Sequence, residues 1–442
     1  MENYFKRSRK RKQKGYTLIE LVVSMSLFMI IMVIASQAFN SIISQSSRIS
    51  KMEESNIEGV VGLEVMRHDL VQMGFGLPWS WKYRITSGTP TAFAHLTSCG
   101  LKYAEAADST GLKLNDAPNN VPRAFVAYAK LGQFSSAYIS VKGTTVGRAK
   151  AAQRWTYIPF LNYSASAWES RPVSFASNNP KVGNMVLMVN SDVNNSALDH
   201  ALIASPGSSA TSGTISSFSV AFKNSGTVDD YLPTNQNQTY MVYGLMDDNS
   251  PDFRMPFNRT DFFIGKNLST NIVPPFCAER TGVLYKATVN HGSSTGGAYT
   301  YIPLLDCVAD MQVVLGWNTD LLTPAGTSEI IPKATGVNAY SSLSDVSGGA
   351  VTASPASAAG DIANWLITPR TLREQLKIVK IYILAQEGKR DSNYNAPATI
   401  DLGDLTANGF KKTYTLTAEQ RKFRWKVYRI VVSPKNLMSN SY

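Results

Sequence analysis

A serine between two glycines is the closest approach to a nucleophile motif in this chain. Gly292-Ser293-Ser294-Thr295-Gly296 fits the G-x-S-x-G pattern, in which a sharp strand-to-helix turn exposes a catalytic serine. The residues that follow, 297–301, are typical of a strand and not of a helix. The segment therefore predicts a hairpin turn. Since no nucleophile–base set is visible elsewhere, we predict no catalytic residues and no enzyme.

Oxygen and nitrogen ligands for a metal are also poorly arranged. The run 247–252 (Asp-Asp-Asn-Ser-Pro-Asp) offers oxygen atoms that suit Ca²⁺, but it lacks EF-hand spacing and the terminal glutamate. A polar turn is the simpler interpretation. The histidines are scattered, without an H-E-x-x-H motif: His68, His95, His200 and His291. We predict no metal site and no cofactor.

Basic and aromatic side chains alternate near residue 425. Five cations are interleaved with three aromatic residues: Arg421, Lys422, Arg424, Lys426 and Arg429 with Phe423, Trp425 and Tyr428. Such a combination can hold single-stranded nucleic acid by charge and stacking. Because side chains of a strand alternate between faces, an ordinary half-exposed strand has the same pattern. Binding of DNA or of another acidic ligand or surface stays an alternative.

One carboxylate, Glu20, stands at the edge of an uncharged stretch that runs from Leu21 to Ser47. A charge at such a position is expensive in a bilayer, so it indicates a function. Seven basic residues precede Gly15: Lys6, Arg7, Arg9, Lys10, Arg11, Lys12 and Lys14. Basic residues hold an N-terminus in the cytoplasm, so we predict a single-pass membrane protein whose remainder lies outside the cytoplasm.

The segment Gly-Tyr-Thr-Leu-Ile-Glu-Leu at 15–21 resembles the class III signal of type IV prepilins and pseudopilins. The resemblance implies that prepilin peptidase cuts after Gly15 and methylates the new amine of Tyr16. It also implies that the membrane is the bacterial inner membrane. Tyr16 replaces the more usual Phe. Gln37 stands where many major pilins have proline, so no kink is predicted there.

The same resemblance implies an assembly role for Glu20. Its carboxylate would neutralise the cationic amine of a neighbouring subunit, because an unpaired buried charge is heavily penalised. The pair would set the axial register of the subunits. The alternative is a glutamate that snorkels to the interface without a partner.

Two ordinary export signals compete with the prepilin interpretation. A secretory signal would be cut near Ser36-Gln37-Ala38, and an uncleaved anchor would span Leu21–Phe39. Both leave Glu20 unexplained.

Composition indicates a globular chain with a tether. The 442 residues are 44% hydrophobic and 17% charged, which allows two or three domains. Removing residues 1–15 leaves 36 basic and 31 acidic side chains, so the net charge falls from +11 to +5. A net charge of about +5 does not require a nucleic-acid partner.

Three cysteines are present, and an extracytoplasmic location permits a disulfide. Cys277 and Cys307 lie 30 residues apart and flank a hairpin-like segment, so we predict that they pair. Cys99 would then be free or intermolecular.

The elements that carry these residues form an α+β chain. We predict a leader at 1–15, a membrane-anchoring and assembly helix at 16–76, and a β-rich extracytoplasmic head at 77–442. One helix face would carry Met52, Ile57, Val60, Leu63 and Leu70. Candidate strands are 125–130, 137–142, 156–161, 185–190, 215–222, 239–245, 282–289, 311–317, 378–385, 411–416 and 423–432. Loop insertions are 205–213, 291–297 and 341–360.

Parts of the helix end and of the strands 306–316, 372–385 and 424–437 resemble PilW-type minor pilins. That implies a minor type IV pilin which takes part in priming, assembly or tip capping of pili. Its partners would be prepilin peptidase, minor and major pilins and the inner-membrane assembly machinery, and its final location the pilus or cell surface. The alternatives are a GspJ-like pseudopilin of a type II secretion system, and a pilus-tip adhesin or DNA-uptake subunit.

Overall fold

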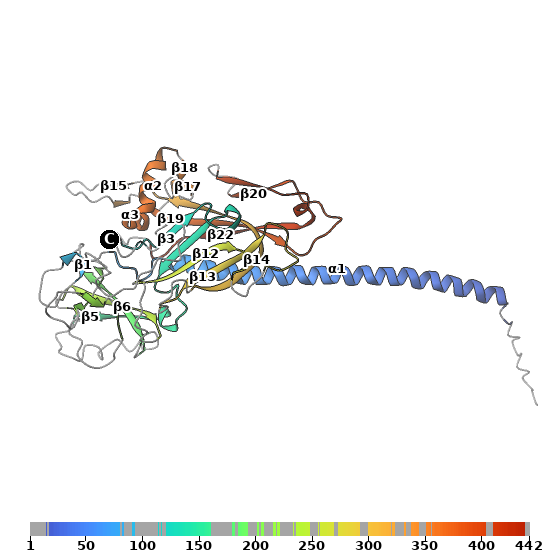
Figure 1. Ribbon diagram of the computed structural model, residues 1–442, viewed down its shortest axis with the longest axis horizontal. Coiled ribbons are helices and arrows are strands. Elements are labelled where there is room, and N and C mark those ends of the chain that lie inside the picture. The colour runs from blue at the N-terminus through green and yellow to red at the C-terminus, as the bar shows by residue number, and fades with distance from the viewer. Residues whose placement is uncertain are drawn as a thin grey trace, which may run out of the picture. The chain divides into compact units, whose positions relative to one another are not determined.

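Figure 1 shows the computed structural model, an apolar N-terminal helix followed by a β-rich head, as the α+β class predicts. It describes residues 15, 17–79, 82–83, 91–92, 114, 116, 121–160, 179–181, 184–192, 201–202, 205–206, 215–217, 219–221, 233, 236–247, 255, 257–268, 273–291, 299–319, 321–322, 331–332, 337–343, 351–354, 356–403 and 410–437. The chain divides into two compact units, Met1–Glu54 and Ser55–Tyr442.

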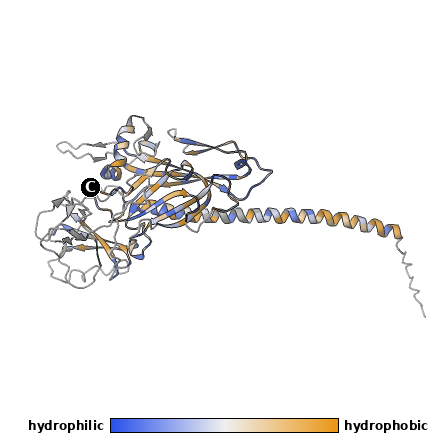
Figure 2. Cartoon of the chain, in the orientation of Figure 1, coloured by the Kyte–Doolittle hydropathy of each residue, from blue (hydrophilic) through white to orange (hydrophobic). Residues whose placement is uncertain are grey.

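Helix α1 (Leu18–Gln72) begins in the first unit and ends in the second. Its first 30 residues, Leu18–Ser47, have a mean hydropathy of 2.6, and their side chains are exposed. In Figure 2 this part of the helix is mostly orange, the colour of apolar residues. A helix of this length and composition can cross a membrane.

In the second unit, α1 presents two different apolar faces. Leu63, Met66 and Leu70 are buried against the head, whereas Ile57 and Val60 are 65% and 59% exposed. The predicted single face is therefore wrong in part. Because a helix turns by about 100° per residue, Ile57 lies about 120° around the axis from Leu63.

Glycines let the head approach α1 closely. A Cβ atom at Gly62 would lie 2.0 Å from the carbonyl oxygen of Leu304. One at Gly59 would lie 2.9 Å from a methyl group of Leu305. Glycine is a poor helix former and costs about 1 kcal/mol relative to alanine in a helix interior. Their position shows that they make room for the strand that crosses it.

The helix ends in a turn that docks on the head. Gly74 and Gly76 have φ of +83° and +69°, which glycine adopts without strain. The Gly74 amide donates a hydrogen bond to the Lys142 carbonyl at 2.8 Å, and the Thr144 amide donates to the Phe75 carbonyl at 2.8 Å. The end of α1 is thereby fixed to the neighbouring strand.

A nine-stranded antiparallel sheet forms the centre of the head. The main path is β18 (Val351–Ser354), β17 (Ala339–Leu343), β14 (Tyr299–Trp317), β13 (Gly282–Val289), β12 (Asn258–Gly265), β4 (Tyr138–Gly143) and β3 (Phe125–Tyr128). β19 (Leu376–Glu387) also pairs with β14, and β22 (Arg424–Val432) pairs with β19.

Different elements pack on the two faces of this sheet. Met311 and Val313 of β14 alternate with Gln312 and Val314, so the pairs point to opposite faces. The first pair belongs to the core cluster that includes the buried residues of α1. Val314 instead packs in a second cluster with Leu402 and Phe410. Leu402 lies in β20 (Thr399–Gly403), and Phe410 directly precedes β21 (Lys411–Thr415), the strand that pairs with β20 in a hairpin. Helix and hairpin thus cover opposite faces.

A smaller five-stranded sheet is inserted between two neighbouring strands of the large one. The chain leaves β4 after Gly143 and returns in β12, its hydrogen-bonded neighbour. In between lie β5 (Trp155–Pro159), β6 (Met185–Asp192), β7 (Ala201–Leu202), β10 (Ser219–Ala221) and β11 (Gln238–Met246). Phe75, after α1, contacts Trp155 and Tyr243 of this sheet edge-on, with ring centroids 6.4 Å and 5.1 Å away.

Short elements complete the described chain. Two-stranded sheets are β1 (Lys82–Tyr83) with β2 (Thr91–Ala92), β8 (Ser205–Pro206) with β9 (Ile215–Ser217), β15 (Leu321–Leu322) with β16 (Ile331–Pro332), and β20 (Thr399–Gly403) with β21 (Lys411–Thr415). The helices are α2 (Ala359–Ile367) and α3 (Pro369–Gln375), and the 3-10 turns are η2 (Gln133–Ser135), η3 (Lys150–Gln153), η6 (Ala356–Ala358) and η7 (Gln420–Lys422).

Most predicted strands coincide with observed ones, but several predictions need correction. The strand predicted at 311–317 is only the end of β14, which begins at Tyr299. The strand predicted at 215–222 is two short strands, β9 and β10, and the loop predicted at 205–213 begins with β8. The loop predicted at 341–360 contains most of β17, all of β18 and the start of α2. Leu372 and Arg373, which the resemblance placed in a strand at 372–385, lie in α3. The central strand β12 was missed, because its polar residues Arg259 and Asp261 conceal the apolar pattern of a buried strand.

Candidate functional site

The first turn of α1 is closed by reciprocal bonds between Thr17 and Glu20. The Thr17 amide donates a hydrogen bond to Glu20 Oε2 at 3.0 Å, and the Thr17 hydroxyl donates to the same oxygen at 2.9 Å. The Glu20 amide is 3.4 Å from Thr17 Oγ1, which accepts its proton. This is a capping box, with Thr17 as the N-cap residue.

The predicted processing residues lie just before this cap. Gly15 is exposed and outside the helix, and Tyr16 lies outside the described residues. The first helical bond runs from the Leu21 amide to the Thr17 carbonyl at 3.2 Å. Glu20 thus has a local structural role that the sequence analysis missed. The signal was present, because Thr followed three residues later by Glu before an apolar run is a capping-box pattern.

A buried ion pair joins the other end of α1 to the sheet. Asp69 Oδ2 lies 2.6 Å from Lys286 Nζ on β13, and their side chains are 5% and 11% exposed. Burial raises the pKa of Asp69, and the Lys286 ammonium opposes this shift. Arg67, two residues earlier, pairs with Glu64 on the exposed side at 2.7 Å. Asp69 therefore adds a buried ion pair to the apolar contacts between the helix and the head.

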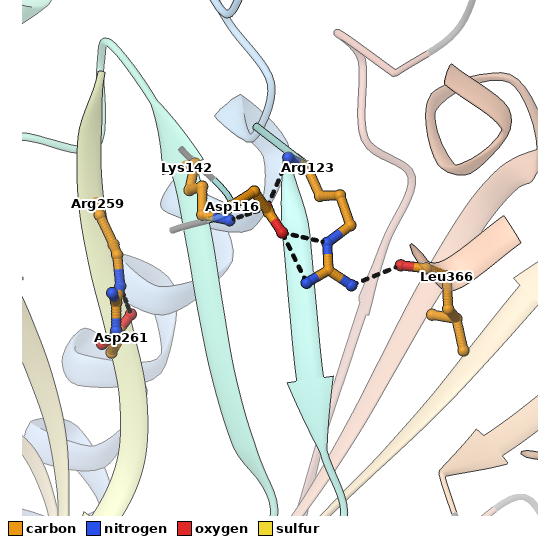
Figure 3. A network of polar contacts seen from close by, with 6 residues as sticks. All are labelled: Asp116, Arg123, Lys142, Arg259, Asp261 and Leu366. Atoms are coloured by element: carbon orange, nitrogen blue, oxygen red, sulfur yellow. Dashed lines mark hydrogen bonds and ion pairs between the residues drawn. The ribbon is translucent and has the colours of Figure 1, made fainter. Parts of the chain in front are cut away.

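A second buried polar network centres on Asp116 (Figure 3). Lys142 Nζ of β4 donates to Asp116 Oδ2 at 2.7 Å, and Arg123 Nε donates to Asp116 Oδ1 at 2.9 Å. Arg123 also donates to the Leu366 carbonyl of α2 at 2.8 Å. The carboxylate thus connects two cations, and the guanidinium extends the network to the helix.

Burial and the opposite charges of neighbouring residues shift the pKa values of this network in opposite directions. Burial lowers the pKa of Lys142 to about 8, although Asp116 acts in the opposite direction. For Asp116, burial acts upward, but the combined attraction of Lys142 and Arg123 leaves the pKa of its carboxyl lowered. Arg259 is the register partner of Lys142 on β12, and it adds a second cation that lowers the pKa of Lys142.

Arg259 is neutralised on its own strand. Its Nε donates to Asp261 Oδ1 at 2.8 Å, and Asp261 Oδ2 accepts the Tyr138 hydroxyl proton at 2.7 Å. Burial, followed by the charge of Asp261, raises the pKa of Tyr138. Because the Arg259 and Asp261 charges are paired and hydrogen-bonded, they can be buried in a central strand.

Cys277 and Cys307 form a disulfide, with their Cα atoms 5.1 Å apart. Cys307 lies within β14, and Cys277 precedes β13, the strand that pairs with it. Cross-linking a loop of this size stabilises a fold by about 3–4 kcal/mol in the chain-entropy model. Cys99 lies outside the described residues.

Most of the other candidate residues lie outside the described part of the chain. The G-x-S-x-G segment 292–296, His95, His200 and residues 248–252 lie outside it. Asp247 accepts hydrogen bonds from the amides of Lys150 and Ala151 at 3.0 and 2.8 Å, as a turn residue does. Within the described ranges, no three His, Cys, Asp or Glu residues gather as a metal site.

Several cations of the basic segment 421–429 bind within the head. The Arg421 Nε donates to the Ala396 carbonyl at 2.7 Å. The Arg424 guanidinium lies 4.5 Å from the centre of the Tyr394 ring. Phe423 is buried and Trp425 half-buried. These contacts favour the ordinary-strand interpretation over a nucleic-acid surface.

Comparison with known proteins identifies the N-terminal segment. Residues 10–36 match the family model of the prokaryotic N-terminal methylation motif. No curated protein matches the chain. A solved type IV-like pilin from Thermus thermophilus is similar at 14% identity over 42% of this chain and 71% of that one, with a TM-score of 0.18. A TM-score this low does not show a shared fold. The proposal for the function therefore starts from the methylation motif.

Proposed function

We propose that this chain is a minor type IV pilin of the PilW type. Prepilin peptidase removes residues 1–15 and methylates the amine of Tyr16. The apolar part of α1 then holds the protein in the inner membrane until it joins other pilins. The 427 residues that remain are bulky for a subunit that repeats along a filament, which favours a minor role in priming, assembly or capping.

The observation that carries this proposal is the order of elements at the N-terminus. The methylation motif at 10–36 overlaps the start of α1. This helix is 55 residues long, and a β-rich head follows it. One end of the helix is apolar enough for a bilayer, and the other packs on a sheet. A helix of this kind can anchor a subunit and then pack against its neighbours without any catalysis.

The Glu20 carboxylate can bind a neighbouring subunit's amine without losing its bonds to Thr17. Both bonds from Thr17 go to Oε2. A carboxylate has about four acceptor positions, so a neighbouring subunit's amine can bind Oε1 while the capping box stays intact. Pairing two charges in low dielectric offsets their desolvation only in good geometry, which is how such a pair would fix register.

The decisive test is the N-terminal sequence and mass of the protein from membranes of cells with and without prepilin peptidase. We expect a methylated Tyr16 start that depends on the peptidase. An intact Met1 would indicate a plain anchor, and a start near Phe39 an ordinary exported protein. Loss of pili on deletion of the gene, with type II secretion intact, would exclude the GspJ-like alternative.

A binding role at the pilus tip is the second candidate, favoured by the inserted sheet. The excursion between β4 and β12 is not needed to complete the large sheet, since those strands pair directly. Replacing residues 155–246 by a short linker should leave pili intact but abolish attachment or DNA uptake. Unchanged attachment and uptake would argue against this role.

A further inference from the structure

We propose that Thr17 is a positioning residue for leader removal: by capping α1, which begins at Leu18, it keeps Gly15, the residue before the predicted cleavage point, outside the helix. This inference rests on the proposed prepilin function and adds a residue to it. It concerns where the helix begins, which is a property separate from the charge of Glu20.

The capping box occupies the groups that would extend the helix. If α1 continued toward the N-terminus, the Thr17 amide would bond the carbonyl of residue 13, and the Glu20 amide would bond the carbonyl of residue 16. In the structure both amides are bonded to each other's side chains, at 3.0 Å and 3.4 Å. The box therefore competes directly with the next helical turn.

A helical start at residue 18 matters for hydrolysis. The peptidase must add water across the Gly15–Tyr16 bond, leaving a carboxyl group on Gly15 and a free amine on Tyr16. Cleavage of a folded chain proceeds from locally open backbone, because a hydrogen-bonded helical carbonyl is not free to meet a nucleophile. Gly15 lies outside the helix in the structure, as this step requires.

Three substitutions separate the cap from other properties of these side chains. Thr17→Val keeps the β-branched shape and removes the hydroxyl group. Thr17→Ser restores a hydroxyl and is the matched control, since Ser is a good N-cap. Glu20→Gln keeps an acceptor for the Thr17 amide and removes the charge, since Gln also serves at this capping-box position.

The test is single-turnover cleavage of the full-length chain, in membranes or nanodiscs, by purified prepilin peptidase, followed by mass spectrometry. We expect Thr17→Val to be cut roughly five-fold more slowly, which corresponds to an N-cap worth about 1 kcal/mol. Thr17→Ser and Glu20→Gln should be cut at nearly the rate of the unmodified chain. The carbonyl carbon shift of Gly15 should become helical in Thr17→Val alone, a change that general destabilisation would not produce.

The outcomes distinguish this inference from its premise. Equal or faster cleavage of Thr17→Val, or slower cleavage without a helical Gly15 shift, overturns the positioning role and leaves prepilin processing standing. Failure of the peptidase to cut the unmodified chain overturns the proposed function, and this inference with it.

Discussion

The Asp69 carboxylate of α1 lies 2.6 Å from the Lys286 ammonium of β13, and both side chains are largely buried. The pair stands one turn beyond Met66, among the residues that α1 buries in the head core. A buried ion pair offsets the desolvation of its two charges only in good geometry. Asp69 and Lys286 therefore fix the position of this part of the helix on the sheet.

Breaking that pair from the lysine side should be costly. Lys286→Met leaves the Asp69 carboxylate buried without its cation, so we expect a loss of about 3–5 kcal/mol in the free energy of unfolding. Urea unfolding of the detergent-solubilised chain measures it. Arg67→Met, which removes the exposed partner of Glu64, should cost less than about 1 kcal/mol. Equal losses in the two variants would show that burial of the pair has no energetic consequence.

Lys142 should make stability depend on alkaline pH. Burial lowers its folded-state pKa to about 8, whereas an unfolded lysine titrates near 10.4. Between these values the unfolded chain binds one more proton, so the stability contribution of Lys142 rises with pH, by at most about 1.4 kcal/mol per pH unit. It is lost again as pH falls through 8. Compared with Lys142→Met, the unmodified chain should gain relative stability from pH 8 to 10, and parallel profiles would contradict the shift.

Gly62→Ala should destabilise the protein although alanine is the better helix former. The new Cβ would meet the Leu304 carbonyl at 2.0 Å, and backbone cannot move as a side-chain tip can. We expect a loss of about 1–3 kcal/mol from overpacking, against a helix gain of about 1 kcal/mol. Gly59→Ala meets a leucine methyl group at 2.9 Å and is the control. Thermal unfolding should rank Gly62→Ala clearly below Gly59→Ala, and the reverse order would be inconsistent with the close approach.

Glu20→Gln should separate processing from assembly. The amide keeps the capping box, so leader removal should proceed, but without the charge a neighbouring amine has no counter-ion. We expect incorporation into sheared filaments to fall at least ten-fold while mature protein accumulates in the membrane. Glu20→Ala, which loses cap and charge, should also be processed more slowly. Normal incorporation of Glu20→Gln would show that the charge of Glu20 does not set the axial register of the subunits.

Local signals in the sequence predicted well the elements that depend on a few neighbouring residues. The uncharged stretch Leu21–Ser47 indicated the apolar helix, and short apolar runs located β6, β11 and β13 to within one or two residues at each end. β12 was not predicted from the sequence, because two of its buried positions carry the charged residues Arg259 and Asp261. Charges normally indicate exposure, and only a partner on the same or an adjacent strand reverses that rule.

By itself, the sequence determined the N-terminal signal, the apolar span, the helix that follows and the β-rich character of the head, because each follows from composition or periodicity over short distances. Only the tertiary structure decided which face of α1 is buried, why Gly62 must be glycine, and how Lys142 meets Asp116. These features depend on strand pairing and on contacts between residues 26 to more than 200 positions apart, for example Lys142 with Asp116 and Asp69 with Lys286. No local pattern encodes such contacts, since each residue's environment is created by segments that fold against it.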